Sequence, residues 1–201
     1  MDPALHLEEL PVLPVDEGAL LRYAMLPRRA APPEALPLPE TVEAVRGIRC
    51  RGVWREYPLV FREEEMDLGF AVTASQSLRR HLAGCTGILL FACTAGVEMD
   101  RLAARAALRS PVHGLLMHAA GAERVESGCD ALGAALAERF PRRELTPRFS
   151  PGYGDLPLAL QRQVMAALDC GRTVGITLTD SLLMRPTKSV TAILGMKGRE
   201  P

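Results

Sequence analysis

The sequence has no excess of charge of either sign and no apolar run long enough to span a bilayer. Its 24 basic and 24 acidic residues cancel, so the positive surface typical of nucleic-acid-binding proteins is not expected. The longest apolar run, Ile88 to Cys93, is far shorter than the roughly 20 residues of a membrane helix. The first residues carry neither the basic nor the apolar region of a signal peptide. We therefore expect a cytoplasmic protein without nucleic-acid or membrane partners.

Cysteines and histidines at metal-binding spacing are also missing. The five cysteines include no Cys-x-x-Cys pair, and their odd number does not suggest a disulfide framework. His113 and His118 are not spaced to share one helical face. Thiols such as Cys85 and Cys93, in or beside an apolar run, are more often core residues than nucleophiles. No metal site is predicted.

The distribution of apolar residues predicts a mixed α+β chain. Residues 86–94 are continuously apolar at their centre, as in a strand buried on both faces, and a glycine turn leads from them into a helix over residues 97–108. Such a turn can bind phosphate, but the glycine motifs of nucleotide sites are missing. The longest predicted helix covers residues 113–140, with one packed and one acidic face, and ends at Pro141.

Shorter elements complete the prediction. Three helices have a residue positioned to cap them: 17–25 with Asp16, 75–82 with Thr73 or Ser75, and 157–168 with Asp155. Gly171 is expected to stop the last helix. Three segments have strand-forming residues: 48–61, interrupted by a bulge or break at Gly52, 173–179 and 190–194. The order lacks the regular βαβ alternation of a doubly wound fold.

The N-terminal part is rich in proline. Five prolines lie between residues 27 and 39, and at this density they forbid a regular helix and favour an extended connector. We therefore divide the chain into two parts. Residues 1–40 are expected to form an N-terminal helix with a proline-rich linker or extension, and residues 41–201 one α+β domain large enough to bury a core.

The loop over residues 146–157, TPRFSPGYGDLP, combines one charge and one aromatic ring with residues that stiffen a turn. Pro151-Gly152 suits the centre of a type II turn, because proline presets the first φ and glycine takes the positive φ of the second. Arg148 and Tyr153 flank this bend, and the glycines let the backbone approach a bound molecule closely. The loop is a candidate ligand site; the alternative is an ordinary surface turn.

Three blocks of the sequence together resemble the activation domain of cobalamin-dependent methionine synthase. They are GILLFACTAG at residues 87–96, RFSPGY at residues 148–153, and ITLTDS at residues 176–181 with PTKSV at residues 186–190. Their order matches the family as well, and Arg-x-x-x-Gly-Tyr is the most specific element. The resemblance covers roughly residues 85–195 and is closest to short members in which the activation domain is a separate chain.

The resemblance implies a C-shaped α+β layer with a twisted, mainly antiparallel sheet flanked by helices. It also implies binding of S-adenosylmethionine and docking on a cobalamin-binding methionine synthase subunit. In that family, an electron from a flavodoxin-type or ferredoxin donor and a methyl group from S-adenosylmethionine convert inactive cob(II)alamin to methylcobalamin. Such a chain is one component of a methyltransferase system and is not expected to turn over substrate alone.

The resemblance also assigns residues to the ligand. Arg148 falls on the family's ligand-binding arginine, and Gly152 and Tyr153 fall on the glycine-tyrosine that follows it. Further candidates for lining the ligand are Phe149, Pro151, Gly154 and Glu138. Glu138 lies one turn after Ala134, which takes the place of a helical acidic residue near the ligand in the long enzymes.

These residue types suit S-adenosylmethionine. The fork of Arg148 can clasp a carboxylate in a bidentate, charge-assisted pair. The ring of Tyr153 can attract the sulfonium cation by about 0.5–2 kcal/mol. Methyl transfer to a strongly nucleophilic cobalt needs alignment above all, so no catalytic residue is predicted.

Two other functions stay open. The chain can instead be an interaction module that docks on a corrinoid protein and has lost ligand binding. It can also be an unrelated small-molecule enzyme on the same scaffold. Saturable binding of S-adenosylmethionine separates the first function from the module, and turnover without a cobalamin protein would support the enzyme.

Overall fold

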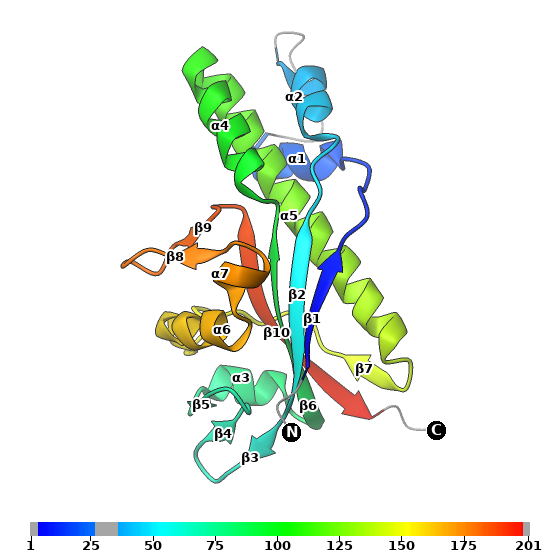
Figure 1. Cartoon of the computed structure of the whole chain (residues 1–201), viewed down its shortest axis with the longest axis vertical. Coiled ribbons are helices and arrows are strands. Elements are labelled where there is room, and N and C mark those ends of the chain that lie inside the picture. The colour runs from blue at the N-terminus through cyan, green and yellow to red at the C-terminus, as the bar shows by residue number, and fades with distance from the viewer. Residues whose placement is uncertain (1–3, 27–35, 199–201) are drawn as a thin grey trace.

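A five-stranded antiparallel sheet forms the centre of the protein. The structure is a computed structural model, and it describes residues 4–26 and 36–198. The strands, in spatial order, are β1 (Leu5–Glu9), β2 (Arg51–Pro58), β6 (Cys85–Thr94), β10 (Ser189–Gly198) and β7 (Arg143–Leu145). Every neighbouring pair is antiparallel. The long strands β2, β6 and β10 run along the molecule (Figure 1). The predicted antiparallel sheet flanked by helices is confirmed.

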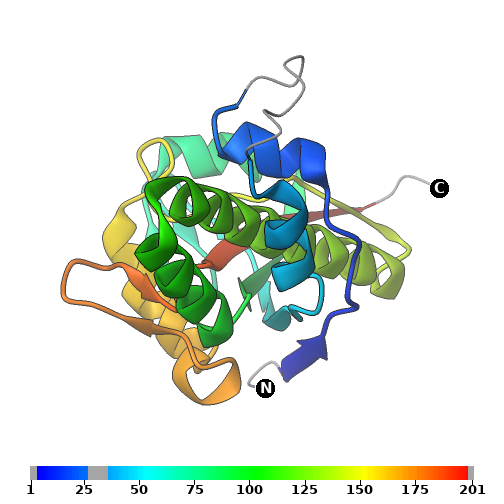
Figure 2. The same ribbon diagram turned by 90° about the horizontal axis from the view of Figure 1, so that it is seen from above.

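Helices cover both faces of this sheet. One face carries α1 (Glu17–Tyr23), α2 (Leu38–Val45), α4 (Val97–Arg109) and α5 (Pro111–Arg139). The other carries α3 (Gln76–His81), the 3-10 turn η1 (Leu158–Leu160), α6 (Gln161–Ala167) and α7 (Cys170–Thr173). Seen from above, α4 and α5 lie side by side with α1 and α2 next to them (Figure 2).

Short strands form two small additional sheets. One consists of β3 (Val60–Phe61), β4 (Met66–Asp67) and β5 (Val72–Thr73), and the other of β8 (Thr177–Leu178) and β9 (Met184–Arg185). The predicted strand over residues 48–61 is therefore two strands in different sheets, β2 and β3.

The central strand β6 supplies both halves of the core. Leu89, Phe91 and Cys93 pack toward α5, whereas Ile88 and Leu90 pack toward α3 and α6. Successive side chains of a strand point to opposite faces, so a strand with helices on both sides needs apolar residues at every position. The sequence-based prediction of a doubly buried strand is confirmed.

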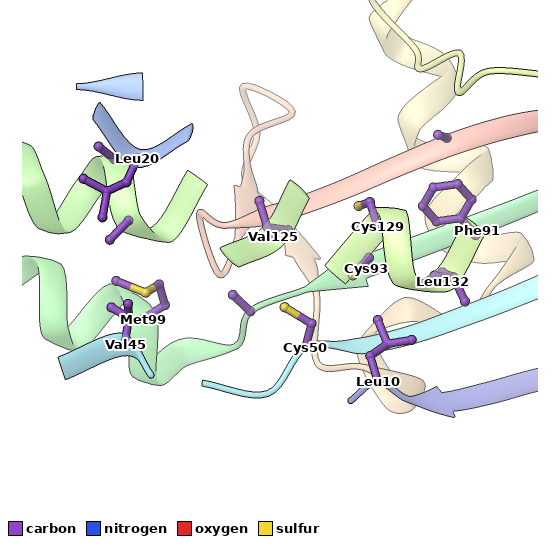
Figure 3. Packing of buried hydrophobic residues seen from close by; sticks show 14 of the residues in the cluster. Leu10, Leu20, Val45, Cys50, Phe91, Cys93, Met99, Val125, Cys129 and Leu132 are labelled. Atoms are coloured by element: carbon purple, nitrogen blue, oxygen red, sulfur yellow. The ribbon is translucent and has the colours of Figure 1, made fainter. Parts of the chain in front are cut away.

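Small residues let α5 approach the sheet closely. A Cβ added at Gly128 would lie 2.8 Å from the Cys50 sulfur and 3.2 Å from the Cys93 sulfur. Both cysteines lie in the core between α5 and the strands (Figure 3). Gly52 pairs in continuous register with β1 and β6, and a Cβ there would lie 3.0 Å from Leu132 of α5. The bulge or break predicted at Gly52 is wrong, because this glycine makes room for the helix within an unbroken strand.

A buried ion pair fastens the N-terminal segment to α5. Glu123 and Arg124 are 1% and 3% exposed. Arg124 donates to the carbonyls of Leu13 at 2.7 Å and Pro14 at 2.8 Å, and the Glu123 carboxylate accepts from the Asp16 amide at 3.1 Å. These bonds, with the pairing of β1 to β2, join the N-terminal residues to the same core. The division of the chain at residue 40 stays a prediction.

Several local predictions are confirmed and others are corrected. Asp16 caps α1 and Ser75 caps α3, as expected. Most of the predicted proline-rich connector, residues 27–35, lies outside the described residues, but α2 begins at Leu38 because a proline is tolerated in the first turn of a helix.

The predicted strand over residues 173–179 shrinks to Thr177–Leu178. The chain before it forms the short helix α7, and Gly171 lies inside this helix instead of stopping the previous one. The amides of Val174 and Ile176 both donate to the Cys170 carbonyl. The alternation of apolar residues here therefore reflects a helix end and a turn, whose side chains are buried without strand pairing.

We expect Gly128→Ala to lower the free energy of unfolding by about 1–3 kcal/mol, the usual cost of overpacking, because the new Cβ would lie 2.7 Å from the Cys50 Cβ. Gly133→Ala is the matched control on the same helix, since nothing lies within 4 Å of its Cβ position. It should raise stability by about 1 kcal/mol through helix propensity. Urea denaturation measures both, and an unchanged Gly128→Ala would contradict tight packing of α5.

Candidate functional site

Backbone hydrogen bonds fasten the loop over residues 146–157 to β10. Phe149 and Ile193 exchange both of their backbone hydrogen bonds, at 3.0 and 2.8 Å. The Thr146 amide donates to the Gly195 carbonyl at 2.9 Å, and the Thr146 hydroxyl accepts from the Gly195 amide at 2.8 Å. The loop thus begins as an irregular continuation of the sheet, and its position is set by β10.

The bend of this loop has the geometry predicted from its residues. The Ser150 carbonyl accepts a hydrogen bond from the Tyr153 amide at 3.2 Å across Pro151 and Gly152. Gly152 has a φ of +94°, as the third residue of a type II turn requires. The turn leaves the ring of Tyr153 63% exposed, so this side chain is available at the surface.

Asp155 fixes the far end of the loop by capping α3. Its carboxylate accepts hydrogen bonds from the Ser75 hydroxyl at 2.5 Å and from the amides of Gln76 at 2.8 Å and Ser77 at 3.0 Å. These bonds, the Ser75 hydroxyl foremost, hold the pKa of Asp155 well below its usual range. The prediction that Asp155 caps the helix after it is wrong, because its side chain turns back to a helix earlier in the chain.

Gly154 also serves this contact with α3. A Cβ at Gly154 would lie 2.6 Å from the Ser77 hydroxyl oxygen, so the loop can approach α3 only with a glycine there. The neighbouring Phe149 is half-buried between the rings of His81 at 5.0 Å and Tyr153 at 6.3 Å. Gly154 and Phe149 thus pack the loop against α3, and neither lines the groove between the loop, α5 and β10.

Arg148 forms ion pairs with two carboxylates of α5. Its guanidinium lies 2.9 Å from Glu126 and 3.0 Å from Asp130. These acids are one turn apart and share one face of the helix. Glu138 is exposed eight residues beyond Asp130, about 12 Å further along the helix. The acidic face of this helix was visible in the sequence, but only the fold shows which acids meet Arg148.

A groove of about 230 Å³ opens between the loop, α5 and β10. Glu126 lies on one side, and Pro151 and Tyr153 lie on the loop side. Its remaining lining residues are Ser150, Leu158, Gln161, Leu182, Met184, Ser189, Val190 and Thr191. Gln161 and Thr191 are buried and hydrogen-bond to each other at 2.8 Å, so their polar groups are satisfied. Arg148 lies beside the groove through its contact with Glu126.

The charges at this end of the groove favour a ligand that carries both signs. One guanidinium faces two carboxylates, so an added cation is attracted and an added carboxylate finds the fork of Arg148. The exposed ring of Tyr153 offers a face to a cation. The rest of the lining is half apolar and half polar but uncharged, which suits the body of a small organic molecule.

The chain shares its fold with one solved structure in particular, the crystal structure of the MetH reactivation domain bound to AdoHcy. The TM-score is 0.72 at 16% sequence identity, with 98% of this chain and 80% of that chain covered. No family model matches the sequence, and no curated protein is significantly similar to it. The likeness shows the fold, and it confirms the fold that the sequence blocks predicted.

Over residues 4–26 and 36–198, no helix has the length and apolar character needed to cross a membrane. The same residues contain no group of three or more histidine, cysteine, aspartate or glutamate side chains arranged to hold a metal ion.

We expect Asp155→Asn to lower the thermal midpoint near neutral pH. A carboxylate with a lowered pKa stabilises the folded state above the unfolded pKa of about 3.9 and loses this contribution as the pH falls toward its folded value. The difference between wild type and Asp155→Asn should therefore shrink as the pH is lowered from about 4 toward 2. Exposed Asp180→Asn is the control. A pH-independent difference would show that the charge does not hold the loop.

Proposed function

We propose that this chain is an S-adenosylmethionine-binding activation subunit, which supports reductive methylation of cob(II)alamin on a separate cobalamin-dependent methionine synthase. The pairing of Arg148 with Glu126 and Asp130 beside the groove carries this proposal. It is supported by the shared fold with the MetH reactivation domain, which was crystallised with AdoHcy. It is also supported by the Arg-x-x-x-Gly-Tyr element at the groove.

The residues at the groove match the charges of this ligand. Arg148 would bind the ligand's carboxylate, exchanging part of its contact with the two acids for a bidentate pair. Glu126 and Asp130 would then attract the ammonium and sulfonium groups. Tyr153 would add its ring face or its hydroxyl group. S-adenosylmethionine carries one more positive than negative charge, which complements one guanidinium between two carboxylates.

The contribution of the chain to methyl transfer would be binding and orientation. The partner's cobalamin, when bound, supplies the nucleophile, and S-adenosylmethionine supplies the methyl group. Glu126 and Tyr153 are the titratable residues of the groove lining, and neither is needed as a base because no proton leaves the reacting atoms. The isolated chain is therefore not expected to turn over substrate.

The surface around the groove offers contacts for a partner protein. Tyr153, Leu158 and Leu183 are 63%, 46% and 60% exposed. Exposed apolar and aromatic side chains around a ligand groove are typical of interaction surfaces. We infer that the cobalamin-binding subunit docks here, so that S-adenosylmethionine in the groove would face the cobalamin. A flavodoxin-type or ferredoxin donor would supply the electron.

The exposed side chains also support the alternative function, an interaction module that docks on a corrinoid protein without a ligand. That function requires the partner surface but not the charges of Arg148. The two functions therefore differ in what happens when S-adenosylmethionine is titrated into the chain.

We expect saturable heat when S-adenosylmethionine is titrated into the wild-type chain, and Arg148→Ala should weaken binding by about 2–3 kcal/mol, or about 30- to 150-fold. Arg148→Lys keeps the charge facing the two acids but not the planar fork, and should also bind more weakly. Arg46→Ala is the control, since its side chain, directly after α2, is 74% exposed. The absence of heat with the wild type would overturn the proposal and favour the interaction module.

We further expect Leu183→Asp to weaken binding to a cobalamin-binding methionine synthase subunit by roughly tenfold or more, while leaving affinity for S-adenosylmethionine unchanged. Leu108→Asp, at the end of α4 and 89% exposed, is the matched control for adding a charge to the surface. The affinity of each variant is measured from its binding to the immobilised cobalamin-binding subunit over a range of concentrations. Equal loss in both variants would place the docking surface elsewhere.

A further inference from the structure

Lysine is rare in this chain, and one of its lysines is buried. Only Lys188 and Lys197 occur among the 24 basic residues, the others being arginines. Lys188 directly precedes β10 and is 8% exposed. Lys197, near the C-terminal end of β10, is half-buried. A lysine is almost never fully buried unless it is paired.

An imidazole lies against the buried amine. The Lys188 Nζ atom is 3.2 Å from Nε2 of His118, an exposed residue of α5. The lysine stem crosses α5 at Gly121, where an added Cβ would lie 3.0 Å from the Lys188 Cε. The stem of Lys188 is thus covered by α5, and its amine lies beside a side chain that is itself exposed.

No carboxylate pairs with Lys188 among the described residues. Asp100 of α4 is the nearby acid, but its oxygens accept the amide and hydroxyl hydrogens of Thr187, at distances from 2.5 to 3.2 Å. The charge of a protonated Lys188 is therefore only partly compensated, by an acid that is hydrogen-bonded to Thr187.

These surroundings weaken proton binding by the amine, compared with an exposed lysine. Burial lowers the pKa of Lys188, and the Asp100 charge opposes the shift. Burial and then the Lys188 charge lower the pKa of the His118 imidazole, again opposed by Asp100. The neutral, nucleophilic form of the amine is therefore easier to reach than in an exposed lysine, and the His118 imidazole lies beside it as a proton acceptor. An arginine in this position could not do the same, because a guanidinium keeps its proton.

We propose that Lys188 is a covalent modification site for small aldehydes, with His118 moving the proton. The neutral Lys188 Nζ attacks the carbonyl carbon, a C–N bond forms, and the carbonyl π electrons pass to oxygen. His118 takes one proton from the nitrogen and gives it to the oxygen, which yields a carbinolamine; the hydroxyl group then leaves together with the second nitrogen proton as water, and an imine remains. One amine and one aldehyde thus give one imine and one water, and no oxidant or reductant is consumed.

An uncharged aldehyde fits this site better than an anionic one, because Asp100 lies close to the amine. Ser189 and Val190, which follow Lys188, line the groove described above. The modified residue would thus lie beside the groove, although the inference does not depend on what the groove binds.

The two lysines provide an experiment within one folded chain. The wild-type protein is incubated with benzaldehyde at pH 7, the imine is reduced with borohydride, and the benzyl group is located by peptide mass spectrometry. We expect Lys188 to be labelled at least about tenfold faster than Lys197, since Lys188 has an imidazole beside its amine that can carry the proton. Equal labelling, or labelling of Lys188 only in urea, would overturn the proposal.

Variants separate the nucleophile from its proton carrier. Lys188→Arg should remove the fast label, and Lys197→Arg, the matched control, should keep it. His118→Gln retains a hydrogen-bond acceptor without a titratable group, and should slow labelling of Lys188 by about 10²-fold at pH 7, the lower end of general acid–base effects. An unchanged rate in a folded His118→Gln, judged by its thermal midpoint, would rule out the role of the imidazole.

Discussion

The close approach of α5 to the central sheet is the constraint on which the rest of the molecule depends. Gly128 admits the sulfurs of Cys50 and Cys93 where any side chain would collide, and Gly52 on the sheet admits Leu132 of the helix. Core packing resists even small changes of volume. These two glycines therefore set how closely α5 packs on the sheet. The same distance sets the position of every side chain that α5 presents to the groove.

The candidate site is assembled across this interface. α5 brings Glu126 and Asp130, β10 holds one end of the loop, and α3 holds the other end through Asp155. Arg148 thus meets its two acids on a scaffold fixed from three directions. A groove on such a scaffold loses little conformational entropy when a ligand binds. The site has one guanidinium and two carboxylates. These charges complement a ligand that has one carboxylate and two cationic groups.

The same helix carries part of the proposed modification site, about two turns before Glu126. There it presents His118 to the amine of Lys188, where burial and an already engaged Asp100 leave the ammonium poorly compensated. Both places follow one physical rule. A charged group whose surroundings perturb it is a candidate for ligand binding or for reactivity.

The sequence by itself determined the elements whose signals are local. The apolar run became β6, the long amphipathic segment became α5, and Pro151-Gly152 formed the expected turn, because burial on two faces, helical periodicity and turn geometry are written in neighbouring residues. Only the tertiary structure decided that Asp155 caps α3 and that Glu126 and Asp130, not Glu138, meet Arg148. These partners are distant in the chain, and the distance between them depends on how closely α5 packs on the sheet.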